Sequence, residues 1–155
     1  PDWTTQKKQR RYYSGKQKQH TLKTQVIYHP KTNKITHVSI HQGSMHDLTI
    51  ANLSLRKLAS YRAVVADKAY IGLSYKGLVF TPFKKPKGKP LDEVLKHYNQ
   101  FLGKVRIKIE HINRQLKLFK ILSYPYRNRR RRFNLRVNLI AGMVNWMSGW
   151  LSQEV

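Results

Sequence analysis

The chain has no cysteine and very little acid: Asp and Glu together number 7 among 155 residues. The absence of cysteine excludes a disulfide framework and a thiolate zinc site, and it fits a reducing compartment. Because Lys and Arg number 31, the scarcity of acid leaves a net charge of +24. Charge so one-sided indicates a polyanionic partner, of which nucleic acid is the commonest.

Long apolar runs are also missing. The opening segment PDWTTQKKQRRYYSGK holds none, which excludes a signal peptide there. The longest apolar stretch, residues 139–151, is interrupted by two glycines and is too short to span a bilayer. Hydrophobic residues still make up 40% of the chain, which is enough for one core and argues against full disorder. The first residue is Pro1 rather than Met, which indicates a trimmed start or a missing upstream piece.

The hydropathy pattern of the first half predicts strands and one helix. Residues 22–28 and 35–41 enclose a turn that contains Pro30, as in an antiparallel hairpin. Ser44 stands three residues before Asp47, a capping-box pattern, and a helix is expected from there to about residue 60.

Two further strands and two helices are expected after that point. Residues 62–66 form a short continuous apolar run, typical of a strand buried on both faces, and residues 78–80 predict a last strand. After a cap at Asp92, apolar residues recur at helical spacing until Tyr124-Pro125 ends the pattern, and a final helix places Phe133, Val137, Ile140, Val144, Met147 and Leu151 on one face. This order of elements is typical of an α/β or α+β fold, and the early hairpin with a later buried strand favours a mixed sheet, so we expect the α/β class. The expected division is a core of residues 1–124 and an Arg-rich turn with a C-terminal helix, residues 125–155.

Asp67 follows the apolar run directly. It would lie at the C-terminal end of a strand, where sites in open α/β sheets form. The structural alternative is an Asp that opens a turn, helped by Tyr70 and Gly72 just after it. Its position alone leaves both interpretations open.

Glu110 lies on the long predicted helix but off its apolar stripe, on the side that carries Arg106, Asn113 and Lys117. One interpretation is a surface ion pair with Arg106 or Arg114, worth about 0.3–0.5 kcal/mol. The other is a carboxylate ligand of a hard cation, with basic neighbours in contact with phosphate.

Other polar clusters have simpler explanations. His46 and Asp47 could be metal ligands or general-base partners near such a site, although a helix cap also explains Asp47. Neither P-loop nor nucleophile-elbow spacing occurs in the chain. A cluster of arginines joins the last two helices, and in a chain of this charge phosphate contact is preferred over a solvated turn. Its members are Arg127, Arg129, Arg130, Arg131 and Arg132.

Several segments together resemble the DDE-type transposases of bacterial insertion sequences, in the Harbinger-like endonuclease superfamily. The YYSGK block and the YRNRRRRF block are the specific ones. In chain order the segments are KKQRRYYSGKQKQHTLKTQVI (7–27), GSMHDLTIAN (43–52), VVADKAYIG (64–72), RIKIEHINRQLKLFKIL (106–122) and YRNRRRRFNLRVNLIAGMVN (126–145).

The resemblance implies a ribonuclease H-like fold, with a mixed sheet flanked by helices and a long acid-bearing helix. It also implies three carboxylates that bind two ions of Mg²⁺ or Mn²⁺, of which Asp67 matches the second and Glu110 the third. The first lies, in the family, in a D-x-T segment upstream of the proline at which this chain begins, and Asp2 does not match it. We therefore expect the C-terminal part of a transposase, which binds DNA but is inactive or nearly so alone.

DNA, as transposon ends and target, is the partner that this resemblance implies. It also implies a homo-oligomer, no membrane, and a bacterial cytoplasmic location with nucleoid association through DNA. The alternative is a non-catalytic basic nucleic-acid-binding protein of ribosomal or nucleoid type, which fits the charge but has no need for an acid at a strand end. The basic residues expected to contact DNA are Lys16, Lys23, Arg106, Arg114, Lys117, Arg127, Arg129, Arg130, Arg131 and Arg132.

Overall fold

The structure, a computed structural model, describes residues 10–124 and 131–151 and has a mixed α/β architecture. Its elements form two compact units, and each is described by itself. The hairpin unit comprises residues 1–44 and 108–155, and the central unit comprises residues 45–107. The helix α4 (Glu93–Leu118) begins in the central unit and ends in the hairpin unit.

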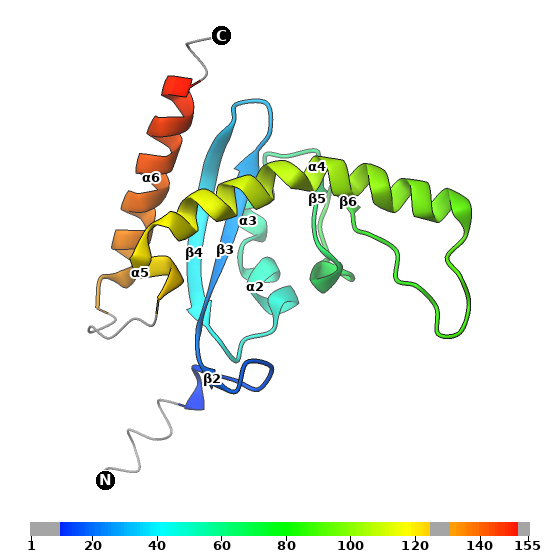
Figure 1. Ribbon diagram of the computed structural model, residues 1–155, viewed down its shortest axis with the longest axis horizontal. Helices are drawn as coiled ribbons and strands as arrows, with labels where there is room; N and C mark the ends of the chain where they lie inside the picture. The colour runs from blue at the N-terminus through cyan, green and yellow to red at the C-terminus, as the bar shows by residue number, and fades with distance from the viewer. Residues whose placement is uncertain (1–9, 125–130, 152–155) are drawn as a thin grey trace. The chain divides into compact units, whose positions relative to one another are not determined.

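Antiparallel strands make up the β-structure of the hairpin unit. Strands β3 (Leu22–His29) and β4 (Lys34–Gln42) form the predicted hairpin, drawn as two long neighbouring strands in Figure 1. Asn33 in their turn has φ 53°, a left-handed conformation that Asn tolerates better than most residues, and its side-chain oxygen accepts the hydroxyl of Tyr28. A much shorter pair, β1 (Tyr13–Ser14) and β2 (Gln19–His20), precedes this hairpin.

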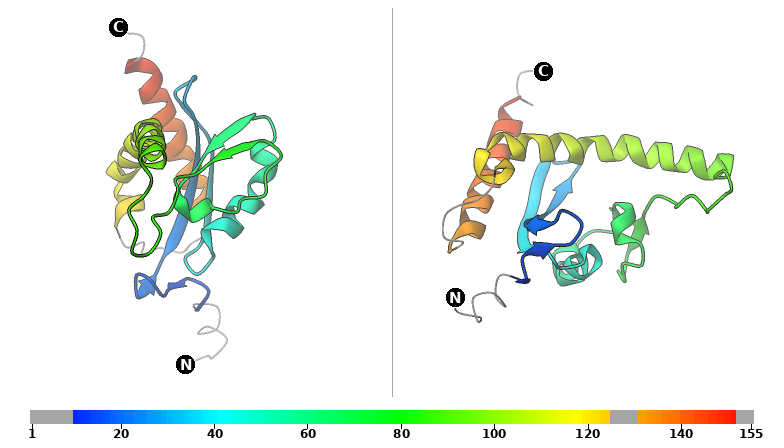
Figure 2. Two further views of the ribbon diagram at one scale, coloured as in Figure 1. Left: turned by 90° about the vertical axis from the view of Figure 1, so that its right-hand side faces the viewer. Right: turned by 60° about the horizontal axis from the view of Figure 1, so that its bottom comes forward.

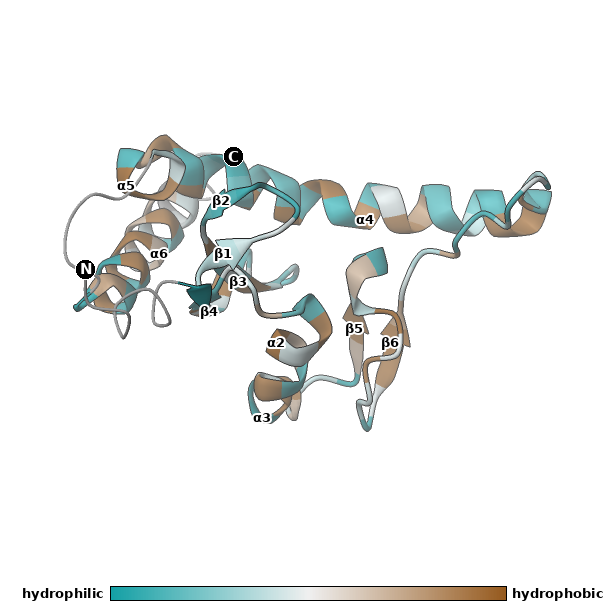
Figure 3. Cartoon of the chain, turned by 90° about the horizontal axis from the view of Figure 1, so that it is seen from below, coloured by the Kyte–Doolittle hydropathy of each residue, from teal (hydrophilic) through white to brown (hydrophobic). Residues whose placement is uncertain are grey.

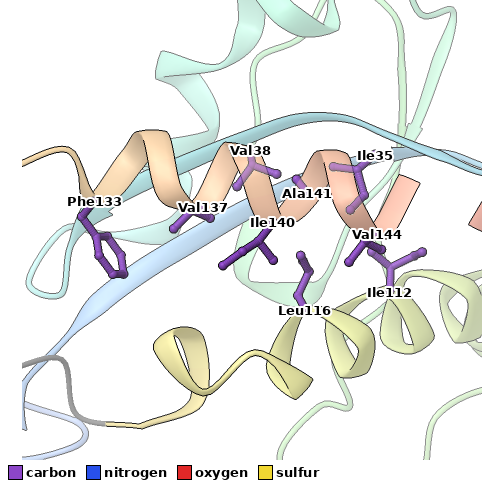
Figure 4. Packing of buried hydrophobic residues seen from close by; sticks show 9 residues of the cluster. All are labelled: Ile35, Val38, Ile112, Leu116, Phe133, Val137, Ile140, Ala141 and Val144. Carbon is purple, nitrogen blue, oxygen red and sulfur yellow. The ribbon is translucent and has the colours of Figure 1, made fainter. Parts of the chain in front are cut away.

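The hydrophobic core of this unit lies between β4, the last turns of α4 and one face of α6 (Phe133–Leu151), as Figure 4 shows. The predicted face of α6 is confirmed through Val144, whereas Met147 is 49% exposed and lies outside the core. Each fully buried side chain of this size contributes about 1.5–3 kcal/mol. The core residues are Ile35, Val38, Ile112, Leu116, Phe133, Val137, Ile140, Ala141 and Val144.

The helix α4 forms where the sequence predicts a helix but ends early. Asp92 caps it as expected, because its Oδ1 accepts the Val94 N–H at 2.9 Å. Figure 3 shows hydrophilic and hydrophobic colours in turn along its length. The helix ends at Leu118, since Phe119 has an extended backbone, and a short helix α5 (Lys120–Ser123) follows. The prediction of one helix up to Tyr124 is therefore wrong at Phe119.

The central unit holds a pair of parallel strands, β5 (Ala63–Val65) and β6 (Leu78–Phe80), visible side by side in Figure 2. Before them come α2 (Asp47–Leu53) and α3 (Leu55–Leu58), and the 3-10 helix η1 (Lys68–Tyr70) follows β5. The predicted capping box is wrong, because the Ser44 hydroxyl donates to the Arg11 carbonyl and His46 caps α2 instead. The Nδ1 of His46 accepts the Leu48 N–H at 3.3 Å.

The predicted single mixed sheet is present only as separate pairs. The described strands form three two-stranded sheets, of which two are antiparallel and one is parallel. The expectation that residues 62–66 are buried on both faces is also wrong, because Ala63 and Val65 are exposed. Among the described strands β5 pairs with β6 alone. Edge-to-edge pairing does not bury the faces of a strand, which need elements packed above and below the sheet.

None of the helices in the described ranges is long and apolar enough to cross a membrane. The division of the chain at residue 124 stays a prediction.

Candidate metal and DNA-binding site

Asp67 is held at the end of the strand pair. The Ala66 N–H still donates to the Phe80 carbonyl of β6 at 3.0 Å, so the strand ladder ends one residue before the acid. The Asp67 side chain then caps η1, accepting the Lys68 N–H at 2.7 Å. Both sequence interpretations of Asp67 therefore describe its place: it follows a strand, and it opens a turn.

The turn after Asp67 has the features that the sequence predicts. The Tyr70 N–H donates to the Asp67 carbonyl at 2.9 Å, and Gly72 has φ 90°, which a residue with a side chain rarely adopts. The ideal Cβ position at Gly72 lies 3.9 Å from Leu48 of α2. Because α2 also contacts η1, the segment that begins with His46 and Asp47 packs close to the turn that Asp67 opens.

Arg106 forms an ion pair with Asp67. Its Nη1 lies 3.1 Å from the Asp67 Oδ1, the same oxygen that accepts the Lys68 N–H. The two side chains are 28% and 51% exposed, respectively, so water reaches the pair. Sequence spacing does not indicate this contact, because the two residues lie on different elements and are far apart along the chain.

Glu110 lies one turn further along α4, on an exposed part of the helix, as its position off the apolar stripe predicts. It belongs to the hairpin unit, whereas Asp67 belongs to the central unit. That the two carboxylates share a site stays a prediction.

Most of the basic residues expected to contact DNA are open to solvent. Lys16, Arg114, Lys117, Arg131 and Arg132 are exposed, and Lys23 on β3 is half-buried. All six belong to the hairpin unit, and Arg106 alone of the described candidates belongs to the central unit. Arg127, Arg129 and Arg130 lie outside the described residues, as does Asp2.

Within residues 10–124 and 131–151, no three His, Cys, Asp or Glu side chains lie close enough together to hold a metal ion. Asp67 offers the hard oxygen donors that Mg²⁺ and Mn²⁺ prefer, but its nearest charged partner is a guanidinium rather than a second carboxylate. The side chains around Asp67 in the central unit therefore do not make a metal site by themselves.

The family model described as DDE superfamily endonuclease matches residues 3–145. The chain belongs to this superfamily. Over 141 residues it is 48% identical to a probable transposase for insertion sequence element IS702 from Microchaete diplosiphon, covering 90% of this chain. The chain spans about half of that relative, since the match covers 51% of its length. No solved structure matches the chain. The resemblance to insertion-sequence transposases is thereby confirmed, and such endonucleases depend on divalent metal ions as a family.

Proposed function

We propose that this chain is the part of an insertion-sequence transposase that binds DNA and carries two of the three metal-binding carboxylates, Asp67 and Glu110. The observation that carries the proposal is the family match over residues 3–145, which includes both acids in the segments VVADKAYIG and RIKIEHINRQ. The similarity to a probable transposase supports transposition as the process.

The fold proposed for the complete protein is ribonuclease H-like. What supports it is the order of elements: a β-hairpin, helices, a parallel strand pair and then a long helix with an acid on it. In such a sheet the hairpin and the parallel pair would be joined by a further strand, and the family's first acid would lie on that strand. The described strands of this chain do not include one that pairs with both β3 and β5.

In the complete protein Asp67 and Glu110 would act as ligands of Mg²⁺ or Mn²⁺, together with the first acid. The chemistry that two such ions would supply is activation of the attacking oxygen and stabilisation of the leaving oxygen in phosphodiester cleavage. The chain's own contribution is positional, because the cap of η1 fixes the Asp67 carboxylate through the Lys68 N–H. His46 and Asp47 remain proposed as neighbours of this site.

The proposed DNA contacts rest on charge and exposure. With 31 basic residues against 7 acids, binding should be driven by neutralisation of phosphates and should show little sequence preference. A homo-oligomer is part of the same proposal. The alternative of a ribosomal or nucleoid-type binder gains no support from the comparisons.

Anisotropy of a fluorescent DNA duplex, measured against salt concentration, tests the binding. Replacement of Arg129–Arg132 by alanine should weaken binding equally for all sequences and flatten the log–log salt slope by about one for each phosphate that is no longer neutralised. The matched control replaces Arg56, Lys57, Lys84 and Lys85 by alanine, because it also removes four positive charges, all four side chains are exposed, and none is a proposed DNA-binding residue. An unchanged slope in the first variant would contradict the role of the cluster.

A further inference from the structure

We infer that the ion pair with Asp67 keeps Arg106 from binding DNA, and that Arg106 binds a DNA phosphate when the charge of Asp67 is neutralised. The inference rests on the proposed function and adds to it a switch within the central unit. It starts from one interaction, the 3.1 Å ion pair between the Arg106 Nη1 and the Asp67 Oδ1.

Arg106 is paired with one of the few acids in the chain. The chain holds 31 Lys and Arg residues against 7 Asp and Glu residues, so carboxylate partners are scarce. A basic side chain without a carboxylate in contact attracts phosphate with its full charge. Arg106 has its charge largely cancelled by a carboxylate in contact with it, so it attracts phosphate less than an unpaired arginine does.

A phosphate can replace the carboxylate as the partner of Arg106. The planar guanidinium fork matches both groups in the same way, with charge-assisted hydrogen bonds. The pair is partly exposed, at 28% and 51%, so it is weak enough to open and accessible enough for exchange. While Asp67 is ionised, it also repels an approaching phosphate.

The Asp67 carboxylate has a second hydrogen-bond partner besides Arg106, so it can stay in place when Arg106 exchanges its partner. The Lys68 N–H donates to the same Oδ1 at 2.7 Å, so the carboxylate stays in place as the cap of η1 when the arginine leaves. A divalent cation that takes Asp67 as a ligand would compete with Arg106 for this oxygen. Asp67→Asn imitates neutralisation and keeps an oxygen that can accept the Lys68 N–H.

The test measures duplex affinity by anisotropy in EDTA, so that no metal contributes. Asp67→Asn should bind roughly fivefold more tightly than wild type, with a salt slope steeper by about one. Asp92→Asn is the matched control, since it removes the same charge from the same unit and keeps the helix cap. It should increase affinity about twofold at most, through net charge alone.

Two double variants decide whether Arg106 is the side chain released. Asp67→Asn/Arg106→Gln should abolish the increase in affinity, and Asp67→Asn/Lys104→Gln should keep most of it, because Lys104 is exposed on the same helix and is not paired with Asp67. Asp67→Ser, which keeps a capping oxygen, replaces Asp67→Asn if that variant unfolds by circular dichroism.

The outcomes separate this inference from the proposed function. If wild type binds DNA tightly and Asp67→Asn and Asp92→Asn increase the affinity equally, the inference that Asp67 restrains Arg106 is overturned, whereas DNA binding by the chain is not. An increase that survives Arg106→Gln overturns it as well. Failure of wild type and every variant to bind DNA overturns both, whereas an increase that requires Arg106 supports the exchange.

Discussion

The side chain of Asn145 on α6 makes two hydrogen bonds to the backbone of Ile35 on β4. Its Oδ1 accepts the Ile35 N–H at 2.7 Å, and its Nδ2 donates to the Ile35 carbonyl at 2.8 Å. A neighbouring strand would satisfy a residue in the same way. Among the described strands β4 pairs with β3 alone, so the Asn145 side chain supplies the hydrogen bonds that a further strand would make to the Ile35 backbone. The same bonds attach α6 to the hairpin.

Asn145→Ala should therefore lower the free energy of unfolding by about 1–3 kcal/mol, because it leaves two backbone groups of a buried residue without these partners. Urea denaturation followed by circular dichroism measures the change. Asn138→Ala is the control, since that exposed side chain bonds only within its own helix, to Asn134. Equal stability of the two variants would show that the bonds to Ile35 add nothing.

Leu116 tests the position of the core along α4. It is 4% exposed, whereas Leu118 on the same helix is 77% exposed. Leu116→Ala should cost about 2–5 kcal/mol through reduced burial and a cavity, and Leu118→Ala should cost almost nothing. The same denaturation experiment compares them. A large decrease in stability in Leu118→Ala would mean that this face of α4 is covered in solution.

Local patterns in the sequence predicted the elements that their own residues determine. The hairpin follows from alternation on either side of a Pro-Lys-Thr-Asn turn, and the buried face of α6 follows from helical spacing between Phe133 and Val144. Asp92 as a cap was predictable for the same reason. In each case the partners are close in sequence or share one helix face.

What the sequence could not predict depends on distant partners or on competing hydrogen bonds. The helix expected up to residue 60 is divided at Ser54, whose hydroxyl donates to the Ile50 carbonyl, a bond that tends to bend or end helices. The Ser44 hydroxyl donates to the distant Arg11 carbonyl, so His46 caps α2. Whether the faces of β5 are buried depends on the elements packed against it, which the apolar run of β5 itself does not determine.

The candidate site divides in the same way. The sequence indicates Asp67 as a candidate because it follows an apolar run, and Glu110 because it lies off the apolar stripe of a helix pattern, and their role in a site stays a prediction. The pairing of Asp67 with Arg106 joins two distant segments, and sequence spacing does not indicate it. The ion pair of Glu110 with Arg106 or Arg114, which helical spacing suggests, stays a prediction. Only the folded chain brings Asp67 and Arg106 together.

His41 on β4 should make stability depend on pH. Burial lowers the pKa of His41 below its usual value, and its Nε2 lies 2.9 Å from the Ser39 hydroxyl. The unfolded chain, with a histidine pKa of about 6.5, therefore takes up the proton at a higher pH than the folded chain does. The free energy of unfolding should fall as the pH drops from above about 6.5 through the lower folded pKa.

His41→Gln removes this proton uptake and keeps a side chain that can hydrogen-bond to Ser39. Wild type should thus lose more stability than His41→Gln between about pH 8 and about pH 5, although other histidines titrate in both proteins. Urea denaturation at the two pH values gives the comparison, and NMR titration of the His41 ring reads its pKa directly. Parallel decreases in the two proteins would exclude a contribution from His41.

Catalysis should require more protein than this chain. Asp67 and Glu110 would provide two of the three carboxylates proposed for the complete protein, and the relative at 48% identity is about twice as long. We expect the chain as given to nick supercoiled plasmid in Mn²⁺ at least about a thousandfold more slowly than a protein of the relative's full length, because a reduction of several kcal/mol in transition-state stabilisation has that effect.

The full-length protein supplies the decisive comparison. Asp67→Asn and Glu110→Gln should each abolish its nicking, since each removes a proposed metal ligand, while Asp92→Asn should leave nicking intact. Plasmid nicking resolved on agarose gels measures the rate, and duplex anisotropy confirms that each variant still binds DNA. Nicking by the chain as given that survives Asp67→Asn would contradict the assignment of Asp67 and the need for a third carboxylate. Loss of nicking in Asp67→Asn together with tighter DNA binding is the combination expected from an acid that both holds metal and restrains Arg106.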